Sequence, residues 1–206
     1  LDYVDNVNRY VEAYKIGSGD ITWIDIIKKI AKKNKPIFLA TGACEMKDVE
    51  RAVAAIKKYH NKIVLMQCNT NYTNSILNHN YLNLKVIRSY RKNFGKEIIL
   101  GLSDHTKGHS SVLGAVALGA RVVEKHFTDN NKRKGPDHKF AMNPKTWFEM
   151  VNETRKLEKS LGDGVKIIQK NEIDSSKVQR RSIRSKHHMY KGQVVEKKDL
   201  VFLRPI

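Results

Sequence analysis

The feature that most constrains the fold is an alternation of five apolar runs with amphipathic stretches, spaced roughly twenty to thirty residues apart. The runs are almost continuously apolar, which is typical of parallel strands that other elements cover on both faces. Each is followed by a segment whose apolar residues recur at helical spacing. The pattern predicts an α/β fold of strand–helix units. The expected strands are residues 13–18, 36–42, 63–69, 97–104 and 120–128, and the expected helices are residues 21–34, 46–58, 82–94, 110–118 and 144–161.

Two architectures fit such units, an open doubly wound sheet and part of a (β/α)8 TIM barrel. Polar side chains fall at the C-terminal ends of the expected strands, which is where a barrel carries its active site. No G-x-G-x-x-G or G-x-x-x-x-G-K-[ST] motif follows any of these strands, which argues against a nucleotide-binding sheet. The sequence therefore favours a partial TIM barrel.

The pattern changes after residue 162. Residues 163–179 are predicted to form a polar linker, whereas residues 180–206 have short apolar bursts separated by a Lys191-Gly192 turn. That tail indicates the start of a small β-rich module. We expect three parts: the barrel portion in residues 1–162, the linker in 163–179 and the module in 180–206.

Composition narrows the function only in part. The formal charge of +18 indicates an anionic partner, which could be nucleic acid, a membrane surface or a small phosphorylated or carboxylated substrate. The lysines occur in ones and twos along helix faces, so solvated surfaces are the simpler interpretation. No apolar stretch approaches the ~20 residues that cross a bilayer, and the two cysteines are too few for a disulfide framework. We expect a cytoplasmic protein that binds neither nucleic acid nor membranes.

Two histidines carry the clearest chemical signal. His105 and His126 each lie at the carboxyl end of a strand, and one helix separates the two strands. A parallel sheet would bring both imidazoles to one rim, where they could hold a divalent metal and leave positions open for substrate oxygens and water. The alternative for either residue alone is a hydrogen-bonded histidine near a strand end. The pair favours a metal site.

A lysine inside an apolar strand suggests an anion site. A bare ammonium at Lys15 is costly unless an anion meets it, and Ser18 lies between two flexible glycines just beyond. An outward-facing lysine on an edge strand is the alternative. Several carboxylates lie near the same rim. They could support a ligand histidine or act as acid or base, or could merely cap a helix or stabilise a turn. These are Asp20, Asp104, Glu124 and Asp137.

These motifs together resemble one family, the sialic acid synthases (N-acetylneuraminate synthases), which include the legionaminic and pseudaminic acid synthases. The tail resembles the start of that family's C-terminal antifreeze-like (SAF) domain. The resemblance implies the last five units of a TIM barrel and a truncated SAF domain, in a fragment that lacks the N-terminal barrel units. The matching motifs are "YKIGSGD", "IFLATG", "LMQCNTNYT", "GLSDHT", "GAVALGARVVEKHFTDN", "GPDHKFAMNP" and "RRSIRSKHHMYKGQVVEKKDLVFLRP".

The resemblance also implies a transferase activity in carbohydrate biosynthesis. Such an enzyme condenses phosphoenolpyruvate with an N-acetylated hexosamine, such as N-acetylmannosamine, and releases phosphate and a nine-carbon 2-keto sugar acid. The implied cofactor is Mn²⁺ or Mg²⁺. The alternatives are a legionaminic, pseudaminic or spore-coat sugar acid synthase, or a non-catalytic basic binding fragment.

Site residues follow from the same resemblance. His105 and His126 match the metal ligands, and Asp20 and Asp137 match the positions expected to be catalytic. Asp20 stands where relatives often carry glutamate. Arg204 matches an arginine that one subunit lends to its neighbour's site, which implies a domain-swapped homodimer. The other expected substrate-binding residues are Lys15, Ser18, Asn69, Thr70, Asn71, Tyr72 and Ser103.

Overall fold

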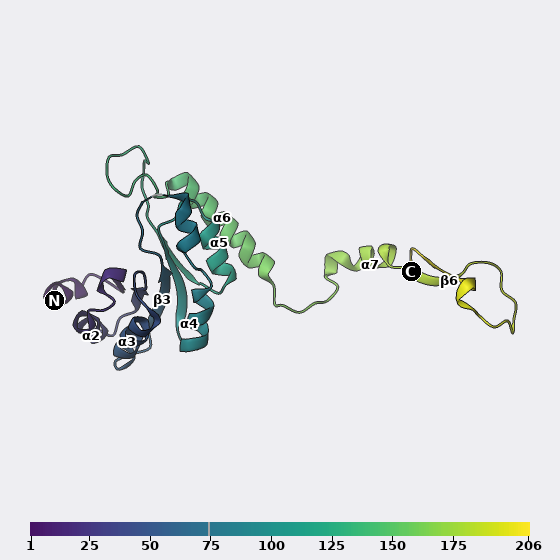
Figure 1. The fold of residues 1–206 in the computed structure, drawn as a ribbon, viewed down its shortest axis with the longest axis horizontal. Coiled ribbons are helices and arrows are strands. Elements are labelled where there is room, and N and C mark those ends of the chain that lie inside the picture. Colours follow the sequence, from purple (N-terminus) through teal and green to yellow (C-terminus); the bar gives the residue numbers. More distant parts are fainter. Residues whose placement is uncertain (74) are drawn as a thin grey trace. The chain divides into compact units, whose positions relative to one another are not determined.

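The computed structural model describes residues 1–73 and 75–206. The chain divides into two compact units, Leu1–Leu161 and Gly162–Ile206, which Figure 1 shows as ribbons. The assignment of residues 163–179 as a linker and of residues 180–206 as the start of a SAF-like module stays a prediction.

The first unit is built on one parallel sheet of five strands in the order β1-β2-β3-β4-β5. Neighbours in the sheet are neighbours in the sequence, as successive strand–helix units require. This arrangement confirms the predicted α/β class and the partial TIM barrel. The strands are β1 (Tyr14–Ile16), β2 (Ile37–Ala40), β3 (Ile63–Cys68), β4 (Ile99–Asp104) and β5 (Val122–Lys125).

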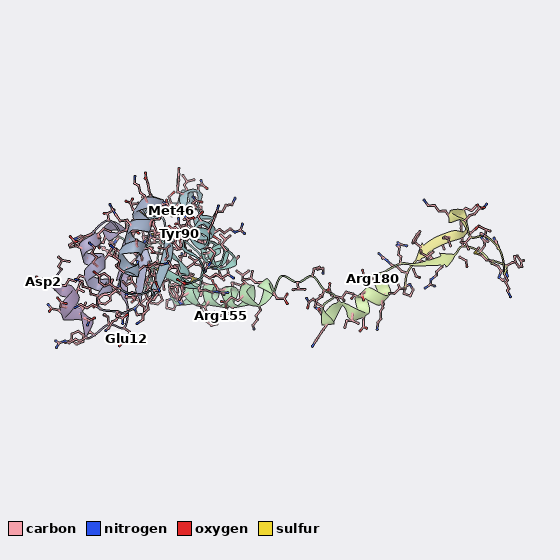
Figure 2. The ribbon with its side chains drawn as sticks, turned by 90° about the horizontal axis from the view of Figure 1, so that it is seen from below. Asp2, Glu12, Met46, Tyr90, Arg155 and Arg180 are labelled. Atoms are coloured by element: carbon pink, nitrogen blue, oxygen red, sulfur yellow. The ribbon has the colours of Figure 1, made fainter. Side chains whose placement is uncertain are left out.

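Helices connect the strands and cover one side of the sheet. Helices α5 and α6 pack together, and α4 packs on β3 and β4 (Figure 1). Tyr90 of α4 is buried in the packed part of this unit (Figure 2). The α-helices are α1 (Tyr3–Asn8), α2 (Ile24–Ala31), α3 (Met46–Lys57), α4 (Val86–Phe94), α5 (Ser110–Ala117) and α6 (Pro144–Leu161), and the 3-10 helices are η1 (Ser18–Asp20) and η2 (Ile76–Tyr81).

Helix α3 illustrates how the sequence determines these elements. Glu45 and Asp48 form a capping box at its start, in which each side chain accepts a hydrogen bond from the other residue's backbone N–H. Its apolar residues recur at helical spacing and form one buried stripe against the sheet. The members of the stripe are Val49, Ala52, Val53 and Ile56.

Side chains alternate between the two sides of each strand. On β3, Ile63 and Leu65 belong to the apolar core beneath the helices, so Val64 and Met66 face the opposite side of the sheet. All six residues of β3 are buried. This two-sided burial explains why its sequence is a continuous apolar run rather than an alternating one.

The sheet is curled. Lys15 Nζ on β1 lies 3.0 Å from Glu124 Oε2 on β5, although four strand spacings, roughly 19 Å along a flat sheet, separate these outer strands. Extended lysine and glutamate side chains cannot bridge that distance across a flat sheet. The ion pair therefore spans a concave face, as expected for part of a barrel.

Several element ends differ from the sequence prediction; for example, the expected helix of residues 82–94 begins only at Val86. The expected helix of residues 21–34 begins at Ile24, because η1 occupies the chain just before it. The expected strand of residues 120–128 ends at Lys125, and Phe127 forms only an isolated bridge with Met142. Hydrophobic periodicity does not register these ends, because an apolar residue still lies beyond each of them, Ile21 before α2 and Phe127 after β5.

The second unit contains an antiparallel strand pair, β6 (Ser182–Ser185) and β7 (Leu200–Leu203). It also contains helix α7 (Ile173–Gln179) and the 3-10 helices η3 (Lys170–Glu172) and η4 (Lys197–Asp199). The sequence pattern indicated no helix in the linker. A capping box formed by Gln169 and Glu172 starts the helical segment there.

Over the ranges that the structure describes, no helix combines the length and the apolar character needed to cross a membrane.

We expect Leu65→Ala to lower the free energy of unfolding by about 2–5 kcal/mol, because it leaves a cavity in a core that relaxes only partly. Leu65 is fully buried on the central strand. Urea denaturation of the two proteins measures the difference. Glu50→Ala, on the exposed side of α3, is the control and should change the stability little. A loss below about 1 kcal/mol for Leu65→Ala would contradict the central place of this strand.

Candidate functional site

The candidate site lies at the C-terminal ends of the strands, on the concave side of the sheet. The alternation of side chains directs Ser103 and His105 from β4, and Glu124 and His126 from β5, to the side on which Lys15 meets Glu124. The loop after β3 contributes a tyrosine to the same place. Residues that are far apart in the sequence therefore converge because parallel strands end at one rim.

The two histidines lie side by side. The ring centroids of His105 and His126 are 5.1 Å apart. His105 Nδ1 lies 3.0 Å from the backbone oxygen of Asn69. Since a carbonyl oxygen only accepts, Nδ1 must carry the hydrogen, and Nε2 keeps its lone pair free for another partner.

His126 is held by the loop that follows β5. Its Nδ1 lies 3.4 Å from Asp137 Oδ2, and its ring lies 5.0 Å from the ring of Phe140. Burial lowers the pKa of His126 below its ordinary value, while the Asp137 carboxylate acts in the opposite direction. The net effect keeps the imidazole neutral near pH 7, which is the form that binds metals.

His105 titrates differently. Burial alone would lower its pKa, but the neighbouring Cys68 thiol and the Asn69 carbonyl outweigh burial and raise the pKa above its ordinary value. The Cys68 sulfur lies 3.8 Å from His105 Nδ1. Cys68 is buried at the end of β3, and no sequence pattern predicted its position beside the histidine.

Tyr72 covers both imidazoles. Its ring centroid lies 4.4 Å from that of His105 and 5.8 Å from that of His126. Half of its surface remains exposed, at 49%. The aromatic ring shields the histidines on one side while its own outer surface stays free for a ligand.

Lys15 and Ser103 converge on one carboxylate. Glu124 Oε2 accepts a hydrogen bond from Ser103 Oγ at 2.7 Å and pairs with Lys15 Nζ at 3.0 Å. Burial alone would raise the pKa of Glu124, but the Ser103 hydroxyl and Lys15 together hold it below its ordinary value. Lys15 is exposed on the edge strand β1, and its ammonium meets this carboxylate on the concave side.

Ser18 and Thr70 approach the start of the loop after β2. The Ser18 hydroxyl accepts a hydrogen bond from Gly42 N at 2.9 Å. A Cβ atom at Gly42 would lie only 1.9 Å from Thr70 Oγ1 and 2.8 Å from Ser18 Oγ, so only glycine fits there. Thr70 Oγ1 in turn lies 3.6 Å from the Cys68 sulfur. The loops after β1, β2 and β3 thus meet beside His105.

The structure does not bring every expected residue into this cluster. Asn71 forms a local turn by accepting hydrogen bonds from Thr73. Asp20 is exposed at the end of η1, and within the described residues its carboxylate has no hydrogen bond or ion pair. Arg204 belongs to the second unit, just after β7. The functional roles of all three stay predictions.

Behind the histidines lies a charged pair that the sequence did not reveal. Lys125 Nζ is 2.6 Å from Asp104 Oδ2, and the two side chains are 1% and 0% exposed. Burial alone would raise the pKa of Asp104, but Lys125 and the hydroxyl of Ser111 lower it below its ordinary value. Only the structure shows that Asp104 and Lys125 are register partners on neighbouring strands; their opposite charges alone did not indicate the pair.

These residues fit a divalent ion in part. Two imidazoles at this separation, with Nε2 of His105 free, match the nitrogen donors of catalytic metal sites. Outside residue 74, no group of three or more His, Cys, Asp or Glu side chains is arranged to hold a metal. The remaining ligands would have to be oxygens from water or substrate.

A curled parallel sheet with polar and charged groups at its C-terminal rim is the arrangement of a TIM-barrel enzyme site. The family model described as "NeuB family" matches residues 1–166. The chain belongs to this family, the sialic acid synthase family predicted from its motifs.

Individual relatives agree. The chain is 37% identical to N,N'-diacetyllegionaminic acid synthase of Campylobacter jejuni, over all of this chain and 61% of that protein. It is 38% identical to an uncharacterised protein of Methanocaldococcus jannaschii, over all of this chain and 60% of that protein. The crystal structure of N-acetylneuraminic acid synthetase from Leptospira borgpetersenii matches with a TM-score of 0.72 and 31% identity, covering 81% of this chain and 56% of that one. The chain thus spans about three fifths of the length of these curated relatives.

We expect Asp137→Asn to lower the pKa of His126 further in metal-free protein, because the substitution removes the negative charge that favours the imidazolium. NMR titration of the His126 ring resonances measures the shift. Asp129→Asn is the matched control, because Asp129 lies in the same loop but pairs with Arg133. An unchanged pKa of His126 in Asp137→Asn would contradict the contact between Asp137 and His126.

Proposed function

We propose that the full-length protein containing this chain is a sialic-acid-type synthase. It condenses phosphoenolpyruvate with an N-acetylated hexosamine and releases phosphate and a nine-carbon 2-keto sugar acid, in a metal-dependent reaction. The observation that carries the proposal is the convergence of two imidazoles and a lysine at one rim, with ring centroids 5.1 Å apart and Lys15 reaching across from the opposite strand. Membership of the NeuB family supports the same reaction class.

An anion site follows from the contacts of Lys15. The ammonium and the Ser103 hydroxyl already bind a carboxylate, that of Glu124. The carboxylate or phosphate of phosphoenolpyruvate would compete with Glu124 for the same donors. Ser18 and Thr70, which approach Gly42 nearby, would complete the anion site.

The histidines would hold Mn²⁺ or Mg²⁺, and the bound ion would polarise the carbonyl oxygen of the open-chain sugar. Tyr72 would shield this region from water and provide an aromatic surface for the sugar. Asp137, which contacts His126, would bind a sugar hydroxyl or accept its proton. Asp20 lacks a comparable contact, and its catalytic role remains a prediction.

One comparison supports a more specific amino-sugar substrate. The relative from Campylobacter jejuni, which matches over the whole of this chain, is a legionaminic acid synthase. A diacetylated amino-sugar is therefore the second candidate substrate after N-acetylmannosamine. We further propose that the full-length protein is cytoplasmic and forms a domain-swapped homodimer to which Arg204 contributes.

The decisive assay uses the full-length gene product. Phosphate release from phosphoenolpyruvate should require both Mn²⁺ and an N-acetylated amino-sugar. Steep salt-dependent retention on DNA without such turnover would contradict the proposal and favour a basic binding module.

We expect His105→Ala and His126→Ala each to lower phosphate release by about a hundredfold or more, since a bound metal contributes several kcal/mol of charge stabilisation. Circular dichroism should show that both variants remain folded. His79→Ala in η2 is the matched control and should retain activity. Near-normal rates in either site variant would refute the ligand assignment.

We expect Arg204→Ala to raise the KM for the amino-sugar more than the KM for phosphoenolpyruvate. The guanidinium would bind the sugar in the neighbouring subunit, so its loss removes binding energy for that substrate alone. Steady-state kinetics with each substrate varied in turn measures both constants. An unchanged sugar KM would exclude Arg204 from the site.

A further inference from the structure

We propose that the buried pair Asp104–Lys125 acts as a positioning device that sets the separation and orientation of His105 and His126. The inference rests on the proposed metal-binding function of the two histidines. The pair lies one residue before each histidine, at paired positions of neighbouring strands. Its side chains point to the helix side of the sheet, so neither contacts the imidazoles directly.

Asp104 is saturated with hydrogen bonds. Its Oδ1 accepts from Thr106 N at 2.8 Å and from Thr106 Oγ1 at 2.7 Å. Its Oδ2 accepts from Lys125 Nζ at 2.6 Å and from the hydroxyl of Ser111 on α5. One carboxylate thereby connects the end of β4, the end of β5 and the first turn of α5.

The pair fixes the backbone on both sides of His105. Asp104 holds the N–H of Thr106, and Lys125 Nζ donates to the carbonyl oxygen of Thr106 at 2.7 Å. His105 therefore lies between two residues whose backbone positions are determined by the same ion pair. Its ring is then oriented by the Asn69 carbonyl.

The backbone of His126 is held both by the residue before it and by the segment that contains Met142. Lys125 precedes it, and the backbone oxygen of His126 accepts from Met142 N at 2.8 Å. Met142 also accepts from Thr128 N at 2.8 Å, which holds the following segment against residues 140–143. Lys125 thus ties both histidine-bearing segments to one carboxylate.

The energetics favour a geometric role. A buried ion pair stabilises a fold weakly, because desolvation offsets the attraction, and an apolar replacement is often neutral or stabilising. What such a pair provides in return is one defined arrangement of its hydrogen-bonded partners. A metal site needs that precision, because partners beyond the ligands typically change metal affinity when they are lost.

The test compares Mn²⁺ affinity by isothermal titration calorimetry in the full-length gene product. The double variant Asp104→Asn/Lys125→Met removes both charges together, so neither remains buried and unpaired. We expect it to fold and to bind Mn²⁺ about tenfold to a hundredfold more weakly. Leu65→Ala, which lowers stability on β3 without touching these contacts, is the control and should keep wild-type affinity.

A crystal structure of the metal-free double variant provides a readout that does not depend on the metal. We expect the imidazoles to move apart and the hydrogen bond from His105 to Asn69 to be lost. Wild-type Mn²⁺ affinity and unmoved rings in the double variant would overturn the positioning role alone. Absence of Mn²⁺ binding to the wild-type protein would overturn the proposed function, and the positioning role with it.

A milder variant decides the matter if the double variant does not fold. Ser111→Ala keeps the ion pair and removes one hydrogen bond to Asp104. We expect a measurable loss of Mn²⁺ affinity that is smaller than that expected of the double variant. Unchanged affinity in Ser111→Ala would then overturn the positioning role.

Discussion

The ends of β4 and β5 are governed by the alternation of side chains across a parallel sheet. Asp104 and Lys125 turn toward the helices, where they form a fully buried ion pair. His105 and His126, one residue later, turn toward the concave side and lie with ring centroids 5.1 Å apart. A shift of register by one residue would exchange these sides, leaving imidazoles in the core and charges at the rim. The buried pair penalises that shift, so packing and function depend on one register.

The arrangement of the site also requires that the sheet is curved. Lys15 reaches Glu124 only because the outer strands of the sheet face each other across a concavity. In the proposed function, an incoming anion would replace the carboxylate of Glu124 as the partner of Lys15. One lysine and one glutamate thus pair near the histidines. This ion pair does not account for the net charge of +18 of the chain.

Much of this arrangement can be predicted from the sequence. Continuous apolar runs predicted the buried parallel strands, and the positions of His105 and His126 after two of them placed both rings at one rim. Sequence alone could not reveal the partners. Lys125 reads as one more surface lysine until strand pairing sets it opposite Asp104. Cys68, the last residue of β3, approaches His105 because β3 pairs with β4. Thr41 directly follows β2 but turns toward the helices, where the Tyr90 hydroxyl donates to its Oγ1 at 2.7 Å. Two properties of the folded sheet decide these contacts: which strands pair, and on which side of the sheet each side chain lies.

The central claim is that the two imidazoles bind one divalent ion. Pulsed electron paramagnetic resonance of Mn²⁺ bound to the full-length protein tests it most directly, because directly coordinated nitrogen atoms modulate the electron spin echo. The account predicts coupling to two imidazole nitrogens, reduced to one in either histidine-to-alanine variant. A spectrum of Mn²⁺ coordinated by oxygen alone would contradict it.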